Sequence, residues 1–179
     1  MQEKKLAKNL TINLNNMKLL GIDPGTGRTG WGVIIKENDT EPLYVAHGCI
    51  VTSQDDAPAQ RLLVLHKELT KLIESFAPDC LIVENIFFGR NAKTAIGVSQ
   101  ARGVIMLSAA QFKLPLHEYT SMTVKKSLLG SGKADKKEIQ VAVRARLNGS
   151  TEKMAFDGKD KDFDDSADAL AIAIHHATK

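Results

Sequence analysis

Residues 19–34 read LLGIDPGTGRTGWGVI, and the rest of the chain is organised around this stretch. Two apolar runs flank a turn rich in glycine and proline, a pattern that predicts a β-hairpin with a longer loop. Asp23 falls at the end of the first run, after residues that should be fully buried. A carboxylate at that place is costly unless a cation or hydrogen-bond donors satisfy it. Asp23 is therefore either the cap of an Asx turn or part of a functional site.

The composition limits the classes of protein to consider. The chain has 179 residues, 43% of them hydrophobic, which is enough for one domain with a core and too little for two large lobes. Its net charge of +3 permits a nucleic-acid partner without requiring one. Cys49 and Cys80 are expected to be reduced core residues, because no secretory signal is visible. No apolar run is long enough for a membrane span, so we expect a cytoplasmic protein.

Apolar periodicity predicts an α/β domain. Residues 1–16 are polar and are expected to be a disordered extension, which leaves 17–179 as a single domain. Short apolar runs predict five strands, at residues 19–22, 30–36, 43–52, 80–84 and 114–119. Apolar steps of three and four predict helices over residues 57–76, 92–112, 121–129, 135–147 and 164–177. This order predicts a mixed five-stranded sheet with helices on both faces, in which the first and fourth strands are parallel.

Four carboxylates lie in unlikely settings. Asp23 and Glu84 end two strands that should be neighbours, and Asp165 and Asp168 share one face of the last predicted helix. Acids in a first helical turn commonly complement the helix dipole, so Asp165 by itself is open to that interpretation. Asp168 is a full turn further in and is flanked by apolar residues.

Together these four acids predict a metal site. Like charges in one place repel each other unless hard cations are present. Ligation by oxygen alone suits Mg²⁺ or Mn²⁺ better than zinc. Two such ions can activate a water and stabilise the leaving oxygen of a phosphodiester. The sequence therefore predicts a Mg²⁺-dependent phosphodiester hydrolase with two ions per site.

Basic residues near the predicted helix 135–147 favour contact with nucleic acid. Lys133, Lys136 and Lys137 surround a glycine-rich turn and a helix amino end, two features that bind phosphate well. A solvated charged face is the alternative interpretation for any one of these lysines.

Several motifs together resemble the RuvC family of bacterial Holliday junction resolvases. They are GIDPG at 21–25, VE at 83–84, QARGV at 100–104, EY at 118–119 and ADALAIAI at 167–174. The resemblance spans residues 17–177. It implies an RNase H-like fold, a homodimer, and symmetric nicks in two strands of a four-way DNA junction that leave 5′-phosphates. It also implies the RuvA–RuvB branch-migration complex as a partner.

The resemblance extends to individual residues. It implies that the catalytic, metal-binding acids are Asp23, Glu84, Asp165 and Asp168. Phe87 stands where the family has an aromatic that stacks on a base near the crossover, with packing on a neighbouring element as the alternative. Lys125 and Lys136 match basic positions that the family uses on DNA, and Arg90 is expected to contact phosphate. His175 and His176, near the end of the chain, are expected to lie at the surface and not to act as ligands.

Other functions stay open at this point. Residues 21–27 also resemble the phosphate loop of actin-like ATPases and sugar kinases, but those proteins need two lobes and a second phosphate loop. An RNase H-type nuclease of other specificity and a non-catalytic junction-binding module on the same fold are the remaining alternatives.

Overall fold

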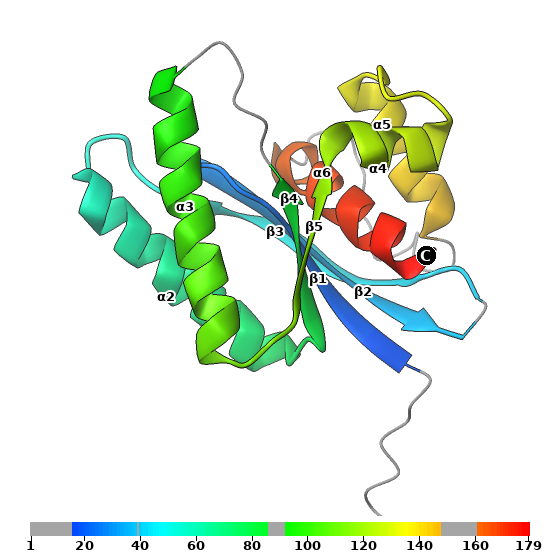
Figure 1. The fold of residues 1–179 in the computed structure, drawn as a ribbon, viewed down its shortest axis with the longest axis horizontal. Helices are drawn as coiled ribbons and strands as arrows, with labels where there is room; N and C mark the ends of the chain where they lie inside the picture. The colour runs from blue at the N-terminus through cyan, green and yellow to red at the C-terminus, as the bar shows by residue number, and fades with distance from the viewer. Residues whose placement is uncertain (1–15, 39, 86–91, 148–160) are drawn as a thin grey trace, which may run out of the picture.

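A five-stranded sheet forms the centre of the molecule and carries helices on both faces (Figure 1). The computed structural model describes residues 16–38, 40–85, 92–147 and 161–179. The strands are β1 (Asn16–Asp23), β2 (Arg28–Glu37), β3 (Leu43–Val51), β4 (Cys80–Asn85) and β5 (Leu116–Thr120). Their order across the sheet is β3-β2-β1-β4-β5.

The sheet combines an antiparallel meander with two parallel strands. β1, β2 and β3 pair antiparallel in sequence order. After the crossover helix, β4 returns parallel to β1, and β5 pairs parallel to β4. Both sides of β1 and β4 are covered by helices, and this explains their nearly continuous apolar sequences.

The helices divide between the two faces of the sheet. On one face lie α2 (Pro58–Phe76) and α3 (Ala92–Gln111), and on the other α4 (Ser121–Leu129), α5 (Lys136–Arg146) and α6 (Lys161–Ala177) (Figure 1). Each face has its own cluster of buried apolar side chains. Thr120 caps α4, and Asp135 with Glu138 forms the predicted capping box of α5.

Helix α6 lies directly against the β1–β2 hairpin because glycines face it. A Cβ atom on Gly21 would overlap the carbonyl oxygen of Ala169, and one on Gly30 would overlap the carbonyl oxygen of Asp165. Only residues without a side chain allow the helix backbone to approach so closely. The two glycines therefore set how near α6, which carries Asp165 and Asp168, comes to the end of β1.

Most of the predicted architecture is confirmed. The mixed five-stranded sheet, the parallel pairing of β1 with β4 and all five predicted helices are present. Helix α6 begins at Lys161 instead of residue 164, and β5 begins at Leu116 instead of residue 114. In the described part of the chain, no helix combines the length and the apolar character that a membrane span needs.

One expectation about the end of the chain is wrong. His175 is buried, with 5% of its surface exposed, and His176 is half-buried. Both belong to the last two turns of α6, where the helix still packs on the sheet. Position 175 follows the buried residues Ala171 and Ile172 by four and three positions, so it continues their stripe.

We predict that Gly30→Ala lowers the free energy of unfolding by about 1–3 kcal/mol, the usual cost of forcing extra atoms into a packed contact. The added methyl group would push α6 away from β2, since it would overlap the Asp165 carbonyl. Chemical denaturation measures this change. Gly27→Ala, in the same hairpin, is the control, because its Cβ would lie 3.4 Å from the Arg61 guanidinium, an ordinary contact. Equal stabilities for the two variants would contradict the prediction.

Candidate active site

Asp23 and Glu84 meet where two neighbouring parallel strands end. Ile22 of β1 is paired with Val83 of β4, so the next residue on each strand, Asp23 and Glu84, lies at the same edge of the sheet. The two carboxyl groups are close enough to share a hydrogen bond. Two carboxylates in this position can be accommodated only if a proton or a cation lies between them.

Asp165 and Asp168 complete the cluster from the amino-terminal half of α6. Burial raises the pKa of Asp23 well above its ordinary value, and the charge of Glu84 is the next cause. Asp168 and Asp165 raise the pKa of Asp23 further. All four acids that the sequence singled out are therefore within electrostatic reach of one point, the carboxyl group of Asp23.

Two lysines lower the pKa of Asp168 and so oppose the effect of its burial. Burial raises the pKa of Asp168, and the charge of Glu84 adds to this effect. The ammonium groups of Lys136 and Lys125 lower it, so both lysines lie near the acids. The structure thus brings Lys125, on α4, and Lys136, on α5, close to Asp168.

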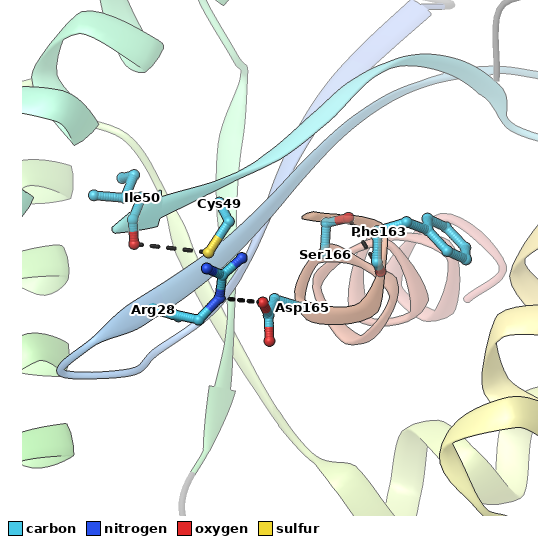
Figure 2. Close-up of polar contacts among 6 residues, drawn as sticks. All are labelled: Arg28, Cys49, Ile50, Phe163, Asp165 and Ser166. Atoms are coloured by element: carbon cyan, nitrogen blue, oxygen red, sulfur yellow. Dashed lines mark hydrogen bonds and ion pairs between the residues drawn. The ribbon is translucent and has the colours of Figure 1, made fainter. Parts of the chain in front are cut away.

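Arg28, at the start of β2, forms an ion pair with Asp165. Figure 2 shows its guanidinium group directed at the Asp165 carboxylate at the beginning of α6. The pair is partly exposed to solvent, so its own contribution to stability is small. Its effect is local, because it places a positive charge on one of the four carboxylates.

The loop that follows Asp23 is held from three directions. Thr29 Oγ1 donates to the carbonyl oxygen of Gly25 at 2.8 Å. The carbonyl oxygen of Thr26 accepts from Thr52 Oγ1 and from Arg61 Nη2, both at 2.6 Å. Arg61 of α2 also donates from Nε to Thr52 Oγ1 at 3.0 Å. These bonds restrain the backbone next to Asp23 and therefore the position of its carboxyl group.

A cleft of about 690 Å³ opens beside Glu84. Its walls come from the ends of β1, β4 and β5, from α3 and from the start of α4. The lining residues are Pro24, Glu84, Asn85, Val98, Thr120, Ser121 and Met122. The amino end of α4 lies in this wall, and its unpaired N–H groups and positive dipole end favour an anionic ligand.

The structure describes some of the predicted DNA-binding residues and not others. Lys133, Lys136 and Lys137 are exposed around the start of α5, and Lys125 donates from Nζ to the carbonyl oxygen of Ala134 at 2.8 Å. Lys125 therefore links α4 to the turn that carries the other lysines. Phe87 and Arg90 lie outside the described residues.

Sequence reasoning missed Arg28 and Arg61. Neither residue belongs to a motif, and each acts through a partner far along the chain, Asp165 for Arg28 and Thr26 for Arg61. The only signal in the sequence was a basic residue in the turn next to Asp23, which could equally have been a solvated surface charge.

The cluster fits a hard divalent cation. All its donors are carboxylate oxygens, which Mg²⁺ and Mn²⁺ prefer. Burial and mutual repulsion favour a proton on Asp23 and Asp168, as expected for a group of acids without a cation. Asp23, Glu84, Asp165 and Asp168 lie within electrostatic reach of one another, and side-chain movement that brings their oxygens together would let them hold such an ion beside the adjacent cleft.

Comparisons with known proteins point to one family. The family model "Crossover junction endodeoxyribonuclease RuvC" matches residues 19–176. A protein of that name from Roseiflexus sp. is 43% identical over 159 residues, which cover 89% of each chain. One from Caldicellulosiruptor saccharolyticus is 42% identical, over 89% of this chain and 92% of the relative.

Solved structures show the same fold. The RuvC structure of Thermus thermophilus in complex with a Holliday junction substrate has a TM-score of 0.78 and 30% identity, over 90% of this chain and 93% of that one. A Thermus thermophilus RuvC structure described without a substrate has a TM-score of 0.75. The fold of this chain is thus the RNase H-like fold that its sequence predicted.

We predict that Asp23→Asn stabilises the metal-free protein at neutral pH by about 1–3 kcal/mol, because the neutral amide avoids the burial and like-charge repulsion that oppose ionisation of Asp23. The pKa of Asp23 is higher in the folded chain than its ordinary value of 3.8, so protonation of this carboxyl group stabilises the folded state. This stabilisation is complete below pH 3.8 and is lost as the pH rises through the folded-state pKa. In EDTA, the unfolding temperature of Asp23→Asn should therefore increase relative to that of the native chain as the pH rises. With Mg²⁺ present, the order should reverse.

The exposed Asp56→Asn is the control for this measurement, and its stability should follow that of the native chain at every pH. A constant difference between Asp23→Asn and the native chain from pH 4 to pH 9 would contradict the prediction.

We predict that Arg28→Ala binds Mn²⁺ about two- to five-fold more tightly, since an exposed ion pair of about 0.2–1 kcal/mol no longer competes for Asp165. Electron paramagnetic resonance of free Mn²⁺ measures this affinity. Lys67→Ala, on the exposed surface of α2, removes the same charge and should leave the affinity unchanged. Weaker binding by Arg28→Ala would mean that the arginine supports the site instead of competing for it.

Proposed function

The chain belongs to the RuvC family of crossover junction endodeoxyribonucleases, and from this premise we propose that it resolves four-way (Holliday) DNA junctions by nicking two strands symmetrically. A Thermus thermophilus RuvC, 30% identical to this chain, has been solved with such a junction as its substrate. In this proposal the enzyme is an endonuclease of recombination and repair, and its products carry 5′-phosphates.

The observation that carries the proposal is the meeting of Asp23, Glu84, Asp165 and Asp168 beside an open cleft. A structural role alone does not explain four acids in one place, because their burial and mutual repulsion oppose ionisation and so cost stability above the ordinary carboxyl pKa. In our proposal these are the catalytic residues, and they bind two Mg²⁺ ions, for which Mn²⁺ can substitute. Such ions, when bound, supply an activated water and neutralise the charge on the leaving oxygen.

The chain's own basic groups bind the substrate in this proposal. Lys125 and Lys136 lie near enough to Asp168 to lower its pKa, so they can contact the phosphates next to the scissile bond. Lys133 and Lys137 extend this positive surface along the start of α5. We assign Phe87 to stacking on a base at the crossover and Arg90 to a phosphate contact, both on the basis of the family resemblance.

We further propose that two copies of the chain act as a homodimer. Between residues 96 and 110, helix α3 presents a face without charged residues: Ile96, Ser99, Gln100, Gly103, Met106, Leu107 and Ala110 are all exposed there. Ile96 and Leu107 expose 62% and 55% of their surfaces, which is unusual for large apolar side chains. A two-fold symmetric junction is most simply cut twice by a two-fold symmetric dimer.

Family membership also supports association with the RuvA–RuvB branch-migration complex. The protein would act in the cytoplasm, a location that agrees with reduced thiols at Cys49 and Cys80.

A cleavage assay with three substrates tests the proposed function. A mobile four-way junction, its linear duplex and an RNA–DNA hybrid are each incubated with Mg²⁺, Mn²⁺ or EDTA. Paired, metal-dependent nicks confined to the junction support the proposal. Cleavage of the hybrid would indicate a ribonuclease on the same fold, and tight junction binding without cleavage under any ion would indicate a binding module.

We predict that Asp23→Asn lowers the rate of junction cleavage more than about 100-fold, because loss of a ligand should cost at least as much as loss of a group that orients one. Junction affinity, measured by gel retardation, should change by less than about three-fold, since binding depends chiefly on phosphate contacts elsewhere. If binding is lost together with cleavage, Asp23 has a structural role.

We predict that Leu107→Glu converts the dimer to a monomer, because it places a charge in the exposed apolar face of α3. Equilibrium sedimentation measures the change. Val141→Glu on α5, which is 64% exposed in the native chain, is the matched control and should stay dimeric. A native chain that sediments as a monomer, with and without junction DNA, would overturn the proposed dimer.

A further inference from the structure

A cysteine and two histidines gather at the end of the sheet opposite the four acids. Cys80 begins β4, His117 is the second residue of β5, and His176 lies in the last turn of α6. One ligand atom from each residue lies within 4.8 Å of the other two. The registry of β4 and β5 brings Ile82 opposite His117, which explains why Cys80, two residues before Ile82, has its side chain on the same face.

We propose that Cys80, His117 and His176 bind a zinc ion. A thiolate and two imidazoles are a donor set that Zn²⁺ prefers and that Mg²⁺ avoids. Donors around a tetrahedral zinc lie roughly 3.3–3.6 Å apart, given Zn–S of about 2.3 Å and Zn–N of about 2.0 Å. Each pair of ligand atoms therefore needs to close by at most about 1.5 Å, which small side-chain rotations can provide. A water molecule would occupy the fourth coordination position of the zinc ion.

The surroundings of His176 support a ligand role. Tyr119 Oη lies 2.9 Å from Nδ1 of His176. In the proposed site Nδ1–H donates to this hydroxyl and Nε2 binds the metal, the arrangement that orients metal-binding histidines in general. The rings of His117 and His176 are in contact, with 4.4 Å between their centroids, so the two imidazoles lie side by side at the site.

The bound zinc would fasten the end of α6 to the sheet. Cys80 is buried, with 4% of its surface exposed, so the ion would sit between the helix and the strands and not on the surface. It would join β4, β5 and α6, and two of these elements also carry acids of the cluster: β4 carries Glu84, and α6 carries Asp165 and Asp168. This site is separate in place and in donor chemistry from the carboxylate cluster.

Cobalt substitution tests the proposal without relying on activity. The chain is treated with a chelator, which is then removed, and Co²⁺ is added. The proposal predicts a thiolate-to-cobalt charge-transfer absorption at one ion per chain, displaced by Zn²⁺. Oxygen ligands do not produce this band, so cobalt at the carboxylate cluster does not interfere. Zn²⁺ should also raise the unfolding temperature of the native chain.

Three variants complete the test. Cys80→Ala should lose the band and bind Zn²⁺ at least about 100-fold more weakly, because it removes a direct ligand. Cys49→Ala is the matched control and should keep both, since Cys49 does not belong to the cluster. His117→Gln should weaken zinc binding and shift the band. It replaces Cys80→Ala as the test variant if circular dichroism shows that Cys80→Ala does not fold. Absence of the band in the native chain, or its persistence in Cys80→Ala, would overturn the proposal.

Discussion

The close approach of α6 to the β1–β2 hairpin is the constraint on which the rest of the structure depends. Gly21 and Gly30 have no side chains to hold the helix away, and the backbone of α6 occupies the space that their Cβ atoms would fill. Two acids on a helix and two at strand ends thereby come within electrostatic reach of each other. Without this contact Asp165 and Asp168 would belong to an ordinary helix amino end, where acids are common.

The cluster that results works against the stability of the fold. Burial and repulsion raise the pKa of Asp23 and Asp168, so ionising them at neutral pH requires compensation. The chain supplies part of it at Asp168 through Lys125 and Lys136, and Arg28 pairs with the neighbouring Asp165. A divalent cation would supply the remainder, and the same positive groups would then be available to a phosphodiester backbone. Stability and the proposed function therefore impose opposite demands on this site, which is common where a fold holds reactive groups in place.

Much of the architecture could be predicted because it is encoded locally. The apolar run of β4 after a helix indicated a parallel strand, and the spacing of Asp135 and Glu138 indicated the amino end of α5. The pairing of Arg28 with Asp165 could not be predicted, because it joins residues far apart in sequence and depends on how α6 lies on the sheet. The burial of His175 is predictable from its spacing of three residues after the buried Ile172, although it lies near the end of the chain.

The most direct test of the central claim is a crystal structure of the chain with Mn²⁺ and a junction that cannot be cleaved, with data collected at the manganese absorption edge. The account predicts anomalous peaks among the carboxylates of Asp23, Glu84, Asp165 and Asp168, with a junction phosphate beside them and Arg28 no longer paired to Asp165. Bound junction with no anomalous density between Asp23 and Glu84 would contradict it. In that case the four acids would not be a metal site.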